Sequence, residues 1–469
     1  MTTETLIVGG GLAGLSAAYH SNGDYLVLER DERIGGLCRT NWYDGFGFDL
    51  SIHILFTKRP DLAELICDEL LGGRYHDHTR SSWVYSHGVY TGYPFQASLY
   101  GLPVGVATDC LLGLVEARHT VRTEEPANFG EWACATFGDG IAKHFFLPYN
   151  EKVWAIPPEK MDFRWIADRV PVPDLEEVIR GSLQAPTVRH GPNASFWYPK
   201  EGGIESLSKA LYQRLEPGRV KTETEVSAID PTLREVTTTA GETFGYENLI
   251  TSLPLPTLVK LTKGTPPEVQ RAADQLESNT VYTVLLGIGR EHISDHHWVY
   301  THEPDLVFHR ISYPMNFSES LVPEGCSSVM AEISHSPHRD LTGRDLIAET
   351  IEGLQRMGVL RPDDDIRVAE IVEISPAYVI YTLDHEAAVA TILEWMVDQG
   401  IHSVGRFGEW AYFNMDDAIA SGRDAVRTLQ SGGEETIIDL VAAERGLPTA
   451  PWRTRKRVTA GKAKRPARP

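Results

Sequence analysis

The chain has 469 residues, of which 42% are hydrophobic and 23% are charged, ordinary values for a globular protein. This length exceeds what one hydrophobic core usually organises, so two or three domains are expected. The net charge at pH 7 is −21, although residues 453–469 carry eight basic residues and no acids, so the rest of the chain carries −29. Such an acidic body argues against nucleic-acid binding, and 453–469 is predicted to be a basic disordered tail.

Neither a membrane span nor a disulfide framework is predicted. The longest apolar candidate, 99–115, is interrupted by Pro103 and Asp109, and the N-terminus enters a strand without a charged leader, so we expect a cytoplasmic protein. The five cysteines are scattered without paired spacing. The histidines of 76–78 and 296–297 lack Cys or Glu at ligand spacing and are assigned to loops, so no metal site is expected.

The strongest motif lies near the N-terminus, where an apolar run leads into the sequence GGGLAG and a helix of small residues. Gly9 is expected to make a tight turn, Gly11 to let the backbone approach a pyrophosphate, and Gly14 to let helix and strand pack closely. A second apolar strand ends on Glu29, at the distance where an acidic side chain binds the ribose hydroxyls of a dinucleotide. These features together predict a dinucleotide-binding site.

The segment after Glu29 favours a flavin over a nicotinamide. Its sequence, RDERIGGLCRT at 30–40, resembles the arginine and double glycine that follow the glycine motif in glutathione-reductase-type flavoproteins, which include the amine-oxidase-like branch. The resemblance implies FAD as the cofactor. It places Arg30, Gly36 and Leu37 beside the FAD pyrophosphate and ribityl chain.

The rest of the chain alternates between strand-like and helical patterns. In chain order, the predicted elements are a hairpin at 42–50, a helix at 60–72, paired strands at 83–93, mainly helices at 97–190, a helix after Gly202–Gly203, a strand at 220–229, strands at 280–385 interrupted by one helix near 344–357, and a strand at Ile401 before a long helix from about Asp416.

These elements predict a mixed fold, part α/β and part α+β. It consists of a discontinuous Rossmann-like FAD-binding domain, an inserted helical domain and an antiparallel β-sheet substrate domain. The predicted bounds are 1–60, 200–270 and 390–435 for the FAD-binding domain, 97–195 for the helical insertion, and 75–96 with 275–385 for the substrate domain.

Further motifs narrow the possibilities among FAD proteins. They are YPFQ at 93–96, PYN at 148–150, KVWA at 152–155, ADRV at 167–170, GPNASF at 191–196, and GRFG at 405–408 followed by Trp410 and Tyr412. With these motifs the chain resembles the eukaryotic-type UDP-galactopyranose mutases, over about residues 5–430. Those flavoenzymes interconvert the pyranose and furanose forms of a nucleotide sugar.

The resemblance implies a set of site residues. It places Arg169 and Arg310 on the substrate diphosphate, where two guanidinium groups can each bind phosphate oxygens in a fork. It places His53 on the loop against the flavin. The residues implied to line the nucleotide are Tyr93, Phe95, Gln96, Tyr149, Asn150 and Trp154; those near the sugar or phosphates are Asn193, Tyr300 and Tyr412; further FAD contacts are Val226, Gly405, Arg406, Met415, Asp416 and Asp417.

The resemblance also implies a reaction without net redox change. Reduced flavin N5 attacks the anomeric carbon and displaces the nucleoside diphosphate, the sugar ring opens and recloses, and the diphosphate returns. NAD(P)H is implied as the reductant in a separate priming step.

The sequence departs from the family pattern at three places. Ser51–Ile52 replaces the double glycine before His53, Phe317 replaces a tyrosine, and Asp416 with Asp417 replaces amides. The nucleotide, the sugar and the oligomeric state therefore stay open. Two other functions also remain: an oxidase of the amine-oxidase or protoporphyrinogen-oxidase type, and a flavin-containing binding protein without catalysis.

Overall fold

The structure of the protein is a computed structural model that describes residues 2–121, 123–166, 170–185 and 194–431. It contains two seven-stranded sheets and a separate group of helices. The predicted fold class is confirmed. The predicted basic tail at 453–469 lies outside the described residues, as do Arg169 and Asn193.

The dinucleotide-binding domain is built on one of these sheets. Its strands, in spatial order, are β10 (Val226–Asp230), β11 (Glu235–Thr238), β12 (Thr243–Thr251), β1 (Thr2–Val8), β2 (Tyr25–Leu28) and β9 (Val220–Lys221), and β20 (Ile401–Ser403) pairs with β12. All pairings among β20, β12, β1, β2 and β9 are parallel. The parallel centre therefore draws on the start, the middle and the end of the chain.

Helices cover both faces of this sheet because successive side chains of a strand point to opposite faces. Ile7 packs on one side, in a core shared with α1 (Leu12–His20), α7 (Glu205–Tyr212) and α13 (Met415–Gln430). Leu6 and Val8 pack on the other side. The helices on that second side are α8 (Leu255–Leu261), α9 (Pro267–Asp274) and α11 (His385–Asp398).

The strand predicted at 220–229 is wrong in one respect, because the structure divides it into β9 and β10. Glu223 between them has a φ of 52°, which extended strands do not have. The amide N–H of Thr224 donates to the carbonyl of Glu29 at 2.8 Å. The chain thus pairs first with β2 and then turns away to form an antiparallel hairpin.

The second sheet is formed mainly by the chain segments that are predicted from the sequence to form a substrate domain. Its strands, in spatial order, are β18 (Ile366–Ile374), β14 (Thr280–Ile288), β17 (Ser327–His335), β16 (Arg310–Ser312), β15 (Trp298–Thr301), β6 (Ser82–Ser86) and β7 (Val89–Gly92). The sheet is antiparallel as predicted except between β6 and β15, which run parallel. These two strands come from distant segments, so no hairpin dictates their direction.

The helical group lies between β7 and the return to the dinucleotide-binding domain. It comprises α3 (Val104–His119), α4 (Phe129–Ile141), a π-helical turn (Ala142–Phe146), α5 (Leu147–Trp154), a 3₁₀ turn (Pro158–Lys160) and α6 (Leu175–Leu183). Its core is rich in aromatic side chains, including Phe129, Trp132 and Phe137.

The remaining elements are short. They are the hairpin of β3 (Thr40–Tyr43) and β4 (Phe46–Asp49), the pair β5 (Tyr75–Thr79) and β8 (Ser195–Pro199), the pair β13 (Glu277–Ser278) and β19 (Val379–Ile380), the helices α2 (Pro60–Ala63), α10 (Leu346–Arg356) and α12 (Gly405–Gly408), a π-helical stretch (Glu64–Leu70), and 3₁₀ turns at Phe95–Ala97, Pro314–Asn316 and Glu319–Leu321. His76 and His78 thus lie in a strand and not in the predicted loop.

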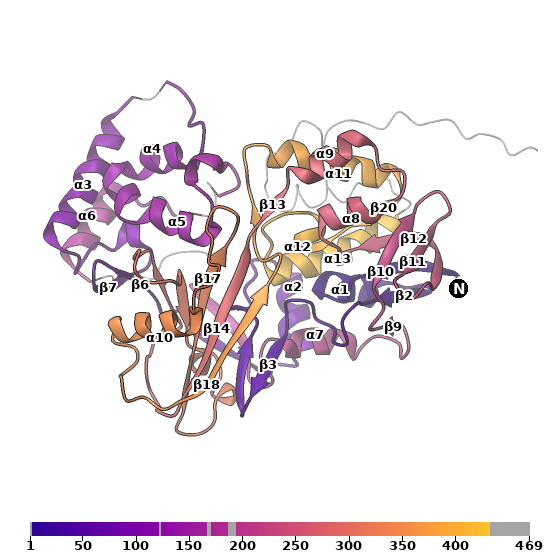
Figure 1. The fold of residues 1–469 in the computed structure, drawn as a ribbon, viewed down its shortest axis with the longest axis horizontal. Coiled ribbons are helices and arrows are strands. Elements are labelled where there is room, and N and C mark those ends of the chain that lie inside the picture. The colour runs from indigo at the N-terminus through magenta and orange to yellow at the C-terminus, as the bar shows by residue number, and fades with distance from the viewer. Residues whose placement is uncertain (1, 122, 167–169, 186–193, 432–469) are drawn as a thin grey trace, which may run out of the picture.

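Figure 1 shows the dinucleotide-binding domain and the helical group at opposite ends of the molecule, with the long strands β14, β17 and β18 between them. Within the described ranges, every helix is too short or too polar to cross a lipid bilayer.

Candidate active site

Close backbone contacts at the start of α1 form what we call the glycine junction (Gly9, Gly14, Gly36 and Gly405). Gly9 has a φ of 104°, and a Cβ on Gly14 would lie 1.9 Å from the Gly9 carbonyl oxygen. A Cβ on Gly36 would lie 3.2 Å from the Cα of Gly11. The two predicted glycine segments therefore lie side by side at the helix N-terminus, a usual place for binding a phosphate group.

The acidic residue of the motif lies at this junction. The Glu29 side chain is 7% exposed, and its two carboxylate oxygens accept hydrogen bonds from the amides of Gly10 at 2.6 Å and Asp31 at 2.9 Å. Arg30 is exposed and lies 3.5 Å from Asp31. Leu37 is partly buried, and Val226 is buried in β10.

The last unit of the chain packs against the first. Gly405 has a φ of 80°, and a Cβ there would lie 2.8 Å from the Cβ of Ala13 in α1. Met415 begins α13, and its sulfur lies 4.0 Å from the Cys38 sulfur. Asp417 accepts from the Asn414 amide at 3.0 Å as part of a capping box.

Buried polar atoms beside this contact fit a bound cofactor. Arg406 donates one hydrogen bond to Phe413, but its Nε and Nη2 atoms are buried and have no partner among the described residues. The Oδ1 atom of Asp416 is likewise buried and unpartnered. Because buried polar groups normally have partners, these atoms and the glycine junction fit the predicted FAD.

A second group of contacts, which we call the carboxylate network, consists of Glu332, Arg310, Ser51 and Ile52. The Glu332 carboxylate accepts from the Ser51 hydroxyl at 2.6 Å, the Ile52 amide at 3.0 Å and the Arg310 Nε at 2.7 Å. Ser51 and Ile52 are the residues that depart from the family's double glycine. One buried side chain thus connects the loop before His53 to the predicted diphosphate-binding arginine.

Charge pairing decides the protonation of this network. Burial raises the pKa of Glu332, but the charge of Arg310 and the hydrogen bonds from His309 and Ser51 together hold that pKa well below its usual range. Burial lowers the pKa of Arg310, but the Glu332 charge holds it well above its ordinary value. Burial also lowers the pKa of His53, whose Nδ1 lies 2.8 Å from the Ser51 carbonyl oxygen. His53 is therefore neutral at pH 7.

Aromatic side chains gather beside Arg310. We call this group, which consists of Tyr93, Tyr149, Trp154, Tyr300, Tyr378 and Tyr412, the aromatic cluster. The ring centroids of Tyr93 and Tyr300 are 5.1 Å apart, and those of Trp154 and Tyr378 are 5.5 Å apart. Arg310 donates to the Tyr378 hydroxyl at 3.2 Å. Five of the predicted substrate residues thus lie in one cluster with an arginine.

Other predicted substrate residues have side chains engaged within the protein. Phe95 is fully buried, with its ring stacked 4.7 Å from that of Phe145. Gln96 donates to the Pro171 carbonyl at 2.9 Å. Asn150 donates to the Phe146 carbonyl and accepts from Trp154 at 3.1 Å. Their predicted contacts with a nucleotide remain predictions.

Three residues of this region were not predicted from the sequence. Glu332 and Tyr378 lie in stretches without a recognisable motif, and only the pairing of β16 with β17 brings Glu332 opposite Arg310. Arg80 is 3% exposed, and its guanidinium lies 4.9 Å from the centre of the Tyr93 ring. A single isolated arginine in a sequence gives no sign of such burial.

A discontinuous dinucleotide-binding domain with an inserted helical group and a β-sheet domain defines the class of FAD-dependent oxidoreductase folds. Residues 12–430 match the family described as flavin containing amine oxidoreductase, and the chain belongs to this family. The protein therefore belongs to a family of flavin-dependent enzymes. The flavin agrees with the cofactor predicted from the glycine motifs.

Solved structures resemble this chain over nearly its whole length. A crystal structure of reduced UDP-galactopyranose mutase has a TM-score of 0.88 and 28% identity, and the match covers 95% of this chain and 98% of that one. A putative protoporphyrinogen oxidase from Exiguobacterium sp. 255-15 has a TM-score of 0.71 and 19% identity, with 92% and 99% covered, which shows the shared fold. The resemblance predicted from the motifs is thus confirmed.

Two relatives found by sequence match a smaller part of the chain than the solved structures do. The coproporphyrinogen III oxidase of Mycobacterium bovis is 23% identical over 305 residues, which are 60% of this chain. The match spans 66% of that relative's length. That of Mycobacterium leprae is 26% identical over 314 residues, covering 61% of this chain and 67% of the relative.

Proposed function

We propose that the protein is a nucleotide-sugar mutase that interconverts pyranose and furanose forms, with UDP-galactose as the first substrate to test. The observation that supports this most is the partly buried Arg310 beside the aromatic cluster. A nucleoside diphosphate needs a cation for its phosphates and flat apolar surfaces for its base. If the protein were an amine or porphyrinogen oxidase, this combination of a cation and aromatic surfaces would have no evident role in binding the substrate.

The glycine junction, Arg406 and Asp416 would hold FAD. When bound and reduced, the flavin supplies a nucleophilic nitrogen for the anomeric carbon, and NAD(P)H is the proposed source of its electrons.

Arg310 is oriented for anion binding by the carboxylate network. Glu332 accepts from its Nε atom and Tyr378 accepts from Nη2, which leaves Nη1 without a partner among the described residues. Nη1 can therefore donate to a phosphate oxygen. Because Glu332 balances the charge of Arg310, a second cation is needed for a diphosphate, and Arg169 keeps that predicted role although it lies outside the described residues.

The aromatic cluster would exclude water from the reacting sugar. Burial raises the pKa of Tyr149 and Tyr300, so both hydroxyls stay protonated and can donate to phosphate or sugar oxygens. Neutral His53 donates from Nδ1 to the Ser51 carbonyl, so its Nε2 can accept a hydrogen bond without adding charge beside the cofactor.

The experiment is an anaerobic incubation of the FAD-loaded protein, reduced with dithionite, with a panel of nucleotide sugars. Chromatography should detect an isomer of unchanged mass with reduced protein and none with oxidised protein. Arg310→Ala should lower turnover by about 100-fold or more while keeping FAD, because it removes a charge contact to the leaving group. Arg356→Ala, which removes an exposed arginine, is the matched control.

A second candidate function is an FAD-dependent oxidase, favoured by the match to coproporphyrinogen III oxidases. If oxidised protein consumes oxygen with coproporphyrinogen and no sugar isomer forms, this function replaces the mutase. Nucleotide binding without any turnover would instead support a binding protein.

A further inference from the structure

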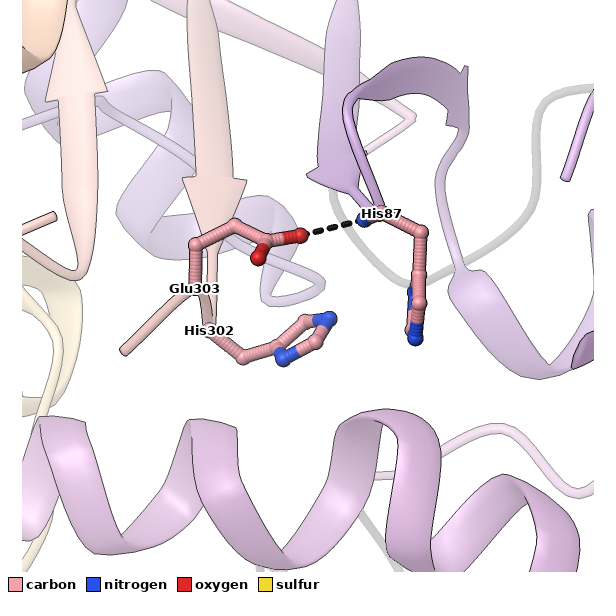
Figure 2. A group of neighbouring side chains, drawn as sticks. All are labelled: His87, His302 and Glu303. Carbon is pink, nitrogen blue, oxygen red and sulfur yellow. Dashed lines mark hydrogen bonds between the residues drawn. The ribbon is translucent and has the colours of Figure 1, made fainter. Parts of the chain in front are cut away.

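A cluster of ionisable side chains lies on the substrate-domain sheet, apart from the proposed active site. His87 occupies the turn between β6 and β7, and His302 and Glu303 follow the end of β15. Because β6 and β15 are neighbouring parallel strands, their ends meet at the same edge of the sheet. One potential ligand atom from each of these three residues lies within 4.8 Å of the others. Figure 2 draws the three side chains.

The two imidazole rings converge on one buried point. The Ser86 hydroxyl lies 2.8 Å from Nδ1 of His87 and 2.8 Å from Nε2 of His302. Ser86 is fully buried, and His302 is 8% exposed. Two histidine nitrogens therefore face each other across a single small hydroxyl, at a place shielded from solvent.

A neighbouring carboxylate fixes the tautomer of His87. Asp109 of α3 lies 3.1 Å from Nε2 of His144, and Nδ1 of His144 lies 3.3 Å from Nε2 of His87. A carboxylate only accepts, so neutral His144 donates to it from Nε2 and presents an unprotonated Nδ1 to His87. His87 then carries its proton on Nε2, and its Nδ1 keeps a lone pair that faces His302. A metal-ligating histidine usually donates its other ring N–H to a neighbouring acceptor, and Nδ1 of His144 takes that place for His87.

Glu303 is held in place by the same turn. One of its carboxylate oxygens accepts from the His87 amide, and Figure 2 shows the second oxygen away from this bond. Lys152 donates to the Glu303 backbone carbonyl at 2.8 Å, so it does not occupy the carboxylate. The carboxylate therefore has lone pairs available for a cation.

We propose that His87, His302 and Glu303 bind a divalent transition-metal ion, with zinc as the probe of choice. Two imidazoles and one carboxylate form a ligand set that zinc and iron(II) use, and this set leaves a position open for water. Ligand atoms around tetrahedral zinc lie about 3.3 Å apart, so binding needs the side chains to close by up to about 1.5 Å and the Ser86 hydroxyl to rotate aside.

This site leaves no local motif, because His87 and Glu303 are 216 positions apart in the chain. A metal here would join the β6–β7 hairpin to the loop after β15. The ring of His302 lies 5.8 Å from that of Phe145, which stacks 5.0 Å from Tyr149 of the aromatic cluster. Occupancy would therefore stiffen the support of the proposed active site, but the site itself does not depend on the proposed function.

The test uses untagged, FAD-loaded protein. The protein is first treated with a chelator and then dialysed. Calorimetric titration with Zn²⁺ should show one tight site per chain, and Co²⁺ should give the visible absorption of a four- or five-coordinate ion. Glu303→Gln keeps a hydrogen-bond acceptor for the His87 amide and should weaken zinc binding by about 100-fold or more, whereas Asp109→Asn should weaken it by about 10- to 100-fold.

His292→Ala is the matched control, because this histidine is 86% exposed and lies outside the cluster. It should bind zinc as the wild type does. The proposal is wrong if the wild-type protein binds no zinc below 100 micromolar, or if Glu303→Gln and His292→Ala bind it equally. Thermal unfolding of the metal-free proteins should be the same for Glu303→Gln and the wild type. This result would show that the variant has lost a metal ligand and has kept its fold.

Discussion

The glycine junction and the carboxylate network hold the proposed active site in different ways. At the junction, backbone meets backbone, and a single Cβ on Gly14 would overlap the Gly9 carbonyl. In the network, one buried carboxylate binds a loop and an arginine through directional hydrogen bonds. The glycine junction therefore depends on the absence of side chains. The carboxylate network depends on the charge of Glu332, even when the size of the side chain is unchanged.

This difference predicts how each region responds to substitution. Added volume should break the junction and abolish cofactor binding, whereas an isosteric loss of charge should break the network and leave the cofactor in place. Four substitutions separate the two behaviours. They are Gly14→Val, Glu332→Gln, and the pair Ser51→Ala and Ser51→Thr, which remove or keep one hydroxyl.

Gly14→Val should have the largest effect. Its side chain would overlap backbone that cannot move without displacing β1 or α1, so we expect a loss of more than about 5 kcal/mol in unfolding free energy and of all FAD. The measurement is flavin absorbance per chain together with a urea unfolding curve. Gly105→Ala, in an exposed helical position with open space around it, should stay within about 1 kcal/mol of the wild type.

Glu332→Gln should come next. The amide keeps an oxygen for Ser51, but it leaves the partly buried Arg310 without its counter-charge, which costs about 3–5 kcal/mol. FAD content should stay near that of the wild type. The rate of sugar isomerisation should fall about as far as it does in Arg310→Ala. Equal loss of FAD and turnover would contradict the separation of network from junction. Glu370→Gln, an exposed change on β18, is the control.

The junction was predictable from the sequence, whereas the carboxylate that joins the network was not, for a physical reason. Close backbone approach permits only glycine, so Gly9, Gly14 and Gly405 leave a local signature in the residues themselves. Glu332 and Tyr378 are ordinary residues whose importance comes from which strands pair. The division of 220–229 and the parallel pairing of β6 with β15 were missed for the same reason, because both depend on contacts between distant segments.

A buried carboxylate at the end of β4, Asp49, predicts a pH dependence. Burial raises the pKa of Asp49 from 3.8 to about 6, although Thr40, Tyr198 and the Ile204 amide all donate to it. Between pH 4 and 6 the folded protein therefore holds a proton that the unfolded chain releases. Stability supplied by this group is present below pH 4 and is lost as the pH rises to about 6, by up to about 3 kcal/mol.

Urea midpoints at several pH values in wild type and Asp49→Asn test this sign. The stability of the wild type relative to Asp49→Asn should fall from pH 4 to pH 6 and stay constant above it. Asp364→Asn provides the opposite control, because the hydrogen bond from Arg290 lowers the pKa of Asp364 and its contribution is lost as the pH falls. A flat difference for Asp49→Asn would contradict the assignment.

Ser51→Ala should have the smallest effect and tests the network most finely. It removes one hydrogen bond to a charged acceptor, which contributes about 2 kcal/mol, and Ser51→Thr should largely restore it. In the Glu332→Gln background the same change should cost only about 1 kcal/mol, because the acceptor is then neutral. The difference of about 1 kcal/mol is the coupling between loop and carboxylate. Equal costs in both backgrounds would mean that Ser51 stabilises the loop by itself, and that Glu332 does not link the loop before His53 to Arg310.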